Sequence, residues 1–184
     1  MHRAWMQTSQ LPATAYPCLH PYPRFMHEAG NRIQTEDFIV DQIVERVSVW
    51  SASLMDNPGG LSNKLNCLAD AGVDLDFIIA RRAPEKPGSG VVFISPLRGD
   101  REIRAASTLG FAISSSIAAL RVEGENEPGA AARLTDLIAD ADINMRGFSG
   151  AVVGRRYIAY IGFDSPEDAN AAANIIQEAE AVVI

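Results

Sequence analysis

Two short loops carry the residues best suited to hold a small charged molecule. The first loop is Asp56-Asn57-Pro58-Gly59-Gly60-Leu61, and the second is Asn126-Glu127-Pro128-Gly129-Ala130. Each loop stands before an expected helix. The first N–H groups of a helix lack partners and lie at the positive end of the helix dipole, so they suit a carboxylate. Because Gly59 and Gly60 have no Cβ, a ligand could approach the backbone closely there.

Charged and amide side chains near these loops could bind the other end of such a molecule. Asp56 and Asn57 could take an ammonium group, and Asp74 or Asn144 from a facing strand could complete the polar shell. The candidate ligand-binding residues are therefore Asp56, Asn57, Gly59, Gly60, Leu61, Asp74, Asn126, Glu127, Gly129, Ala130 and Asn144. A simpler alternative stays open, in which each loop only begins a helix, with Asp56 or Asn57 as N-cap and Pro58 at the first helical position.

The sequence contains no set of residues typical of catalysis or metal binding. A catalytic site needs a nucleophile with a base, paired carboxylates or a bound metal, yet all three histidines, His2, His20 and His27, lie in the opening segment. Cys18 and His20 fall short of the four ligands usual for structural zinc. No phosphate-binding glycine motif occurs. We therefore expect no enzyme activity, no metal and no cofactor.

The composition of the chain argues against some classes of binding partner and indicates where in the cell the protein is expected. The chain of 184 residues has a formal net charge of -7, which argues against a nucleic acid or an anionic membrane as partner, because both attract a surplus of Lys and Arg. The longest apolar stretch, residues 108–120, is broken by serines and a glycine and could not span a bilayer as a helix. We expect a cytoplasmic protein with reduced thiols, and Cys67 buried on a helix.

A repeat is visible at an offset of 70 residues, from position 56 to position 126. The first loop matches the second, and Leu68-Ala69-Asp70-Ala71 matches Ile138-Ala139-Asp140-Ala141. Val73-Asp74-Leu75 then matches Ile143-Asn144-Met145 without a gap. One Pro-Gly pair is a common turn, but two at matched spacing before the same pattern indicate an internal duplication.

Within each copy the hydrophobic periodicity changes in the same order. In the first copy we expect strands at 47–56, 73–82, 91–95 and 112–116, with helices at 58–72 and 100–109. In the second copy we expect strands at 118–124, 143–153, 157–163 and 181–184, with helices at 128–141 and 166–178. Gly72 should close the first helix in the left-handed conformation, and Ser165 or Asp164 should cap the last.

The order β-α-β-β-α-β, found twice, predicts an α+β fold of two tandem ferredoxin-like modules, each an antiparallel sheet with helices on one face. The expected domains are a Pro-rich arm at 1–38, disordered or loosely docked, a first module at 39–116 and a second at 117–184. A module of about 70 residues is marginal alone. We expect the copies to pack on each other and, through their edge strands, to form a homodimer.

The repeated motif resembles the ACT domain family. In the first copy the resemblance lies in the loop 56–61 and in the run Leu-Ala-Asp-Ala-Gly-Val-Asp-Leu at 68–75. The second copy resembles the family through Asn126-Glu127-Pro128-Gly129, 137–139 and 143–145, and the whole resemblance covers about 44–184. It departs from the pattern with Asp142 in place of the helix-ending glycine, and with Ala131 where Leu61 stands, which makes its pocket lip smaller.

The resemblance implies a regulatory protein that binds a small ligand, an amino acid, where modules meet, beside the loop before the first helix and the opening of a neighbour's second strand. The protein would modulate a separate enzyme or transcription factor. Two alternatives remain: a structural or protein-interaction module without a small ligand, and a small enzyme on a ferredoxin-like scaffold. If only one copy binds, we expect the first, because it keeps the full loop and Gly72.

Overall fold

The computed structural model describes residues 42–114 and 117–181, and all of them belong to one unit, Glu36–Ile184. The expected arm at 1–38 lies outside the described residues, as does the end of the expected first domain at 115–116. Cys18 and His20 lie outside them too.

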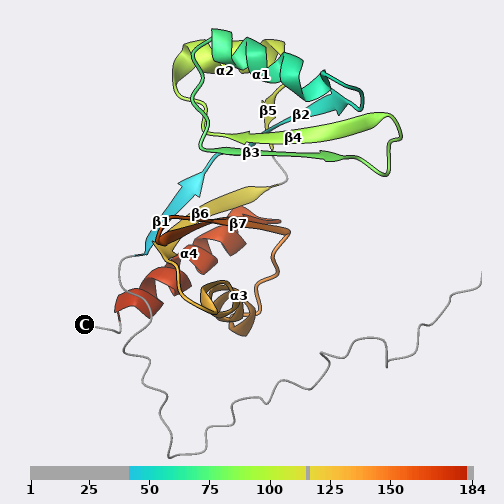
Figure 1. The fold of residues 1–184 in the computed structure, drawn as a ribbon. Coiled ribbons are helices and arrows are strands. Elements are labelled where there is room, and N and C mark those ends of the chain that lie inside the picture. Colours follow the sequence, from blue (N-terminus) through green and yellow to red (C-terminus); the bar gives the residue numbers. More distant parts are fainter. Residues whose placement is uncertain (1–41, 115–116, 182–184) are drawn as a thin grey trace, which may run out of the picture. The chain divides into compact units, whose positions relative to one another are not determined.

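In chain order the elements are β1 (Ile43–Val47), β2 (Trp50–Met55), α1 (Gly60–Asp70), β3 (Phe77–Arg82), β4 (Ser89–Ser95), α2 (Gly99–Thr108), β5 (Ala112–Ile113), β6 (Ala118–Glu125), α3 (Ala130–Asp140), β7 (Gly147–Val153), β8 (Arg156–Phe163) and α4 (Pro166–Ala181) (Figure 1). The strands form two antiparallel four-stranded sheets, with the orders β3-β4-β2-β5 and β1-β6-β8-β7. The predicted fold class, two ferredoxin-like modules, is confirmed.

In the first module, α1 and α2 cover one face of the sheet (Figure 1). Alternate residues of a strand point to opposite faces, so Trp50, Ala52 and Leu54 of β2 share the helix-covered face with Val92 and Ile94 of β4. These side chains are buried together with Leu68 of α1 and Ala106 of α2. The opposite face, which we call the bare face, carries Phe93 and its partner Ile79 of β3.

In the second module, α3 and α4 cover one face of the other sheet (Figure 1). Leu120 pairs with Ile161 and Val122 with Ala159, and all four side chains are buried against the helices. Ile138 of α3 and Ile176 of α4 are fully buried in the same core. The bare face of this sheet carries Gly147 opposite Gly162 and Ser149 opposite Tyr160.

The expected strand at 47–56 is β2, which begins only at Trp50, and the sequence did not predict the strand β1 that precedes it. Residues 48–49 separate the two strands, and β1 pairs with β6 of the second module. The reason is that the apolar residues serve two cores: Val44 packs against the second core, whereas Trp50 lies in the first. A single straight strand could not serve both.

The edge beside β6 is therefore occupied by β1, at the position expected for a strand at 181–184. Instead of ending near residue 178, α4 continues to Ala181. Residues 182–184 lie outside the described part of the chain. The fourth strand of the second sheet is therefore β1, which lies before the first module's helices and not at the end of the chain.

The predicted starts of two helices are wrong by two residues. The first helix begins at Gly60 and α3 begins at Ala130, each after a glycine in the left-handed conformation: Gly59 has φ 87° and Gly129 has φ 82°. Neither helix has a side-chain cap, so Asp56 and Asn57 are not N-caps. The glycine after each proline allows a left-handed turn that delays the helix.

Two predicted helix ends are confirmed, and one predicted burial is wrong. Gly72 has φ 79° at the end of α1, and the Ser165 hydroxyl accepts a hydrogen bond from the N–H of Asp168 (3.0 Å) with Pro166 as the first residue of α4. Cys67, however, is exposed. The buried face of α1 is set by Leu61, Leu65 and Leu68, and position 67 lies off that stripe.

Candidate ligand-binding loops

The first loop is held by its own module. The N–H of Asp56 donates to the carbonyl of Gly88 (3.1 Å), and its carboxylate pairs with the guanidinium of Arg82 on β3 (Nε to Oδ2, 3.0 Å). The Arg82 side chain is largely exposed, so this ion pair contributes little to stability. The carboxylate can therefore exchange Arg82 for another cation at small cost.

The two glycines of the first loop serve its conformation. Gly59 supplies the left-handed turn, and a Cβ on Gly60 would collide with the carbonyl oxygen of Met55. The N–H of Asn57 also donates to this carbonyl (2.9 Å), so the loop folds tightly back on the end of β2. Leu61, at the start of α1, is half-buried and packs against the first core.

The second loop is tied to β8 and α3. The N–H of Asn126 donates to the carbonyl of Arg155 (2.8 Å), which corresponds to the bond of Asp56 in the first loop. Glu127 pairs with Arg133 of α3 (Oε2 to Nη2, 3.6 Å), and Arg133 also donates to the carbonyl of Pro128 (3.0 Å). Arg133 therefore holds the loop against α3, and its guanidinium partly neutralises the carboxylate of Glu127.

A hollow of about 550 Å³ lies beside the second loop. Four predicted site residues line it: Asn126, Glu127, Gly129 and Ala130. Its other wall comes from the start of α3 and from β7 and β8, through Ala131, Ala132, Leu134, Phe148, Gly150, Ala151, Val152, Tyr157, Ile158 and Ala159. The structure thus combines a polar loop with an apolar wall, an arrangement typical of small-molecule sites.

The small residues at the start of α3 help to open this hollow. Ala131 takes the place that Leu61 has in the first copy, and it lies exposed on the lining instead of packing into a core. The N–H groups of Ala131 and Ala132 lie in the first turn of α3, where backbone N–H groups have no partner within the helix. They are therefore positioned to receive an anionic group at the positive end of α3.

Tyr157 closes the apolar wall with a neutral hydroxyl. Burial raises its pKa above the ordinary value, against a smaller lowering by Arg133 and Arg156. Its hydroxyl oxygen accepts a hydrogen bond from Nε2 of Gln42 (3.0 Å), and its ring lies over Gly124, where a Cβ would come within 2.8 Å of it. Gly124 therefore makes the room that the ring needs.

The sequence did not point to the β7 and β8 side of the hollow. Phe148 and Val152 lie on β7, the edge strand of its sheet, and they are 40% and 54% exposed. They are four residues apart and so share one face of β7, and because Phe148 pairs with Ile161 of the second core, this is the helix-covered face. That alternation was visible in the sequence, but only the sheet order shows that β7 is an edge that leaves this face open.

Two predicted site residues lie apart from this hollow. Asp74 and Asn144 are exposed and precede β3 and β7 in the connections from the helices, because those strands begin at Phe77 and Gly147 and not at 73 and 143 as expected. The carbonyl of Asp74 accepts a hydrogen bond from Arg98 (3.0 Å). A role for either residue in binding would require a loop of another module to face it, which stays a prediction.

A charged cluster lies on the bare face of the second sheet. Glu123 bonds to Arg121 (2.5 Å) and to Arg156 (2.7 Å), and its side chain is 18% exposed. Burial acts to raise the pKa of Glu123, but the hydrogen bonds from Arg156 and Arg121 outweigh it, so the pKa lies below the ordinary value. Arg121 also pairs with Glu45 of β1 (Nη1 to Oε2, 3.5 Å), so two guanidinium groups face two carboxylates and the cluster as a whole is balanced in charge.

Within residues 42–114 and 117–181, no three His, Cys, Asp or Glu side chains come together in a way that could hold a metal ion. None of the described helices is long and apolar enough to cross a membrane.

No protein-family model and no curated protein matches the sequence. Solved structures do match the fold. Protein BT0572 from Bacteroides thetaiotaomicron matches with a TM-score of 0.61 at 14% identity, over 76% of this chain and 97% of that one. The regulatory subunit of aspartate kinase from Thermus thermophilus, in its ligand-free form, matches with 0.54 at 16% identity, over 77% and 97%. Aspartate kinase from Clostridium acetobutylicum matches with 0.51 at 13% identity, over 79% of this chain and 35% of the kinase.

These likenesses establish a shared fold. The described chain has the two tandem ferredoxin-like modules that its repeated Pro-Gly motifs predicted. At such low identities a shared fold does not transfer a function, so the function has to be argued from the loops and the hollow.

Proposed function

We propose that the chain is a non-catalytic regulatory protein that binds an amino acid beside the loop 126–130 and modulates a separate enzyme or regulator. The observation that supports this most is the hollow of about 550 Å³ between that loop and the β7–β8 pair. The N-terminus of α3 would receive the carboxylate, Asn126 and Glu127 the ammonium group, and Phe148 and Val152 the side chain. A match to a regulatory subunit of aspartate kinase fits the regulatory part.

The first loop is the second candidate in the same protein. It keeps the predicted residues Asp56, Asn57, Gly59 and Gly60, but Leu61 fills the place that Ala131 leaves open. We therefore place the principal site at the second loop, although the complete motif of the first loop favoured the first copy. A cytoplasmic location remains an expectation from the sequence alone.

The test is a thermal-shift screen of the full chain against the common amino acids, followed by calorimetric titration of any that stabilise it. Ala131→Leu should fill the hollow and abolish binding. Ala171→Leu is the matched control, because Ala171 is an exposed helical residue outside the hollow, and it should bind like the wild type. A stabilisation that Ala131→Leu leaves unchanged would place the ligand elsewhere.

The alternative, a protein-interaction module without a small ligand, is favoured by the apolar edge of the second sheet. Val152 and Val153 of β7 are 54% and 65% exposed. Exposed edge strands pair readily with other chains. A flat thermal response to every amino acid, combined with a stable homodimer, would support this alternative over ligand binding.

A further inference from the structure

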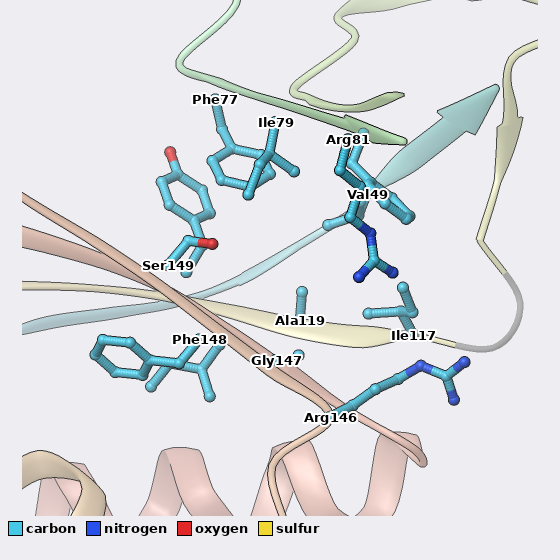
Figure 2. A pocket seen from close by; sticks show the side chains of 14 residues that line it. Val49, Phe77, Ile79, Arg81, Ile117, Ala119, Arg146, Gly147, Phe148 and Ser149 are labelled. Atoms are coloured by element: carbon cyan, nitrogen blue, oxygen red, sulfur yellow. The ribbon is translucent and has the colours of Figure 1, made fainter. Parts of the chain in front are cut away.

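A second hollow, of about 260 Å³, opens between the bare faces of the two sheets (Figure 2). Its lining includes Ile79, Arg81 and Phe93 from the first sheet, and Ala119 and Tyr160 from the second. It contains none of the predicted loop residues. At one side the ring of Phe77 stacks on that of Tyr160, with centroids 4.2 Å apart and planes at 27°.

The floor of this hollow is open because two facing residues have no side chain. Gly147 of β7 lies opposite Gly162 of β8, and both line the hollow. A Cβ on Gly162 would come within 3.2 Å of Ile117, but a Cβ on Gly147 would meet no atom within 4 Å. A side chain at 147 would therefore enter free space without backbone strain.

The charge of the lining is positive. None of the lining residues carries a carboxylate, and two are arginines. Arg146 is paired with Asp164 (2.6 Å). Arg81, by contrast, makes no hydrogen bond or ion pair with any residue in the described ranges, and its guanidinium lies 6.0 Å from the centre of the Phe93 ring. Figure 2 shows it extending from β3 toward Ile117 and Ala119.

An arginine stays charged at every physiological pH, and its planar fork matches a carboxylate. A guanidinium without a partner beside apolar and aromatic side chains favours an anion with an apolar body. The volume lies at the small end for ligand pockets, which limits the ligand to a single ring or a similar group. The positive lining contrasts with the net charge of the whole chain, which is -7.

We propose that this hollow binds a small aromatic monocarboxylate. Arg81 holds the carboxylate, and the ring lies among Ile79, Phe93 and Ile117. Because both sheets line the hollow, the bound molecule contacts both modules at once. The site is separate from the one beside loop 126–130, and neither depends on the other.

The test is a calorimetric titration of the full chain with phenylacetate, and with phenylacetamide as an uncharged probe of the same shape. Phenylacetate should bind, and phenylacetamide should bind about tenfold more weakly or worse, because a charge-assisted hydrogen bond to Arg81 is lost. Arg81→Gln should weaken phenylacetate by a similar factor, and Gly147→Val should abolish its binding by filling the hollow.

Arg101→Gln is the matched control, because it removes one exposed arginine on α2, outside the hollow. It should leave phenylacetate binding unchanged, and amino-acid binding that depends on Ala131 should survive Arg81→Gln. The proposal is overturned if the wild type does not bind phenylacetate at millimolar concentration, or if Arg81→Gln binds it as the wild type does. Should Gly147→Val fail to fold, the Arg81 comparison still decides.

Discussion

Asp142 shows how a single residue adapts a repeated motif. It follows α3 at the place where Gly72 follows α1, and it adopts the same left-handed conformation, with φ 59° against 79°. The closing hydrogen bonds are preserved, since the N–H of Ile143 reaches the carbonyl of Ile138 (3.2 Å) as that of Val73 reaches Leu68 (3.0 Å). The helix end therefore requires the backbone conformation, and glycine only makes it easier to adopt.

We predict that Asp142→Gly raises the free energy of unfolding by about 0.5–1 kcal/mol, because the steric cost of a left-handed residue outweighs the added freedom of glycine in the unfolded chain. Gly72→Asp should lower it by a similar amount. Denaturant unfolding measures both. Equal stability of the wild type and both variants would show that neither helix end is strained.

The ion pairs of Glu123 predict that the free energy of unfolding depends on pH. Its pKa lies below the ordinary carboxyl value of 4.5, so its ionised form stabilises the folded chain above that pH, and the contribution is lost as pH falls through the lowered value. Glu123→Gln should cost about 2 kcal/mol at pH 7, because two charged hydrogen bonds are lost. The difference from the wild type should shrink below pH 4.5.

Denaturant unfolding of both proteins at pH 7 and pH 3 checks this. Glu125→Gln, on an exposed carboxylate at the end of β6, is the control and should have little effect at either pH. A loss in Glu123→Gln that is equal at both pH values would mean that packing, and not charge, accounts for the role of Glu123.

At the scale of elements, β1 decides the topology. It lies at the start of the segment expected to form the first module, 39–116, but pairs with β6 over Ile43 to Val47, and Arg46 bonds to Asn170 of α4 (2.5 Å). Since α4 continues to Ala181, this pairing completes the second sheet. The chain therefore runs from the second sheet, through β1, into the first module and back to the second sheet at β6.

We predict that Val44→Lys loosens the second module and leaves the first unchanged, because Val44 packs against the second core. Native-state hydrogen exchange should show faster exchange of the β6 amides, while those of β2 and β4 keep their rates. Ile43→Lys, on the exposed side of the same strand, is the control. Faster exchange in β2 instead would mean that β1 supports the first module.

Local patterns in the sequence predicted the order of the elements from β2 to α4 and the helix ends at Gly72 and Ser165, because each depends on neighbours in the chain. They did not predict β1, because its pairing with β6 depends on residues far along the chain. They also did not predict that α1 begins at Gly60 and not at Pro58, because the left-handed conformation of Gly59 interrupts the helix after the proline. Phe148 and Tyr157 became site candidates only once β7 was seen to be an edge.

For the whole molecule, the exposed edge strand β7 predicts that two copies of the chain form a homodimer. Light scattering after size exclusion should give about twice the chain mass of 19.8 kDa. Val153→Lys should favour the monomer, since a charge on an edge strand opposes pairing. Ile113→Lys, on the exposed edge strand β5 of the other sheet, should not. A wild type that is monomeric at all concentrations would contradict the expected homodimer.

The proposed function depends on binding of an amino acid in the hollow beside loop 126–130. The most direct measurement is the ¹H–¹⁵N spectrum of the full chain, recorded while the amino acid that stabilises it most is added. The amides of Gly129, Ala131 and Ala132, and those of Phe148 to Ile158, should shift with one saturable affinity, and Ala131→Leu should remove these shifts. If the shifts cluster at 56–61 instead, or none appears with any amino acid, the second loop is not the binding site.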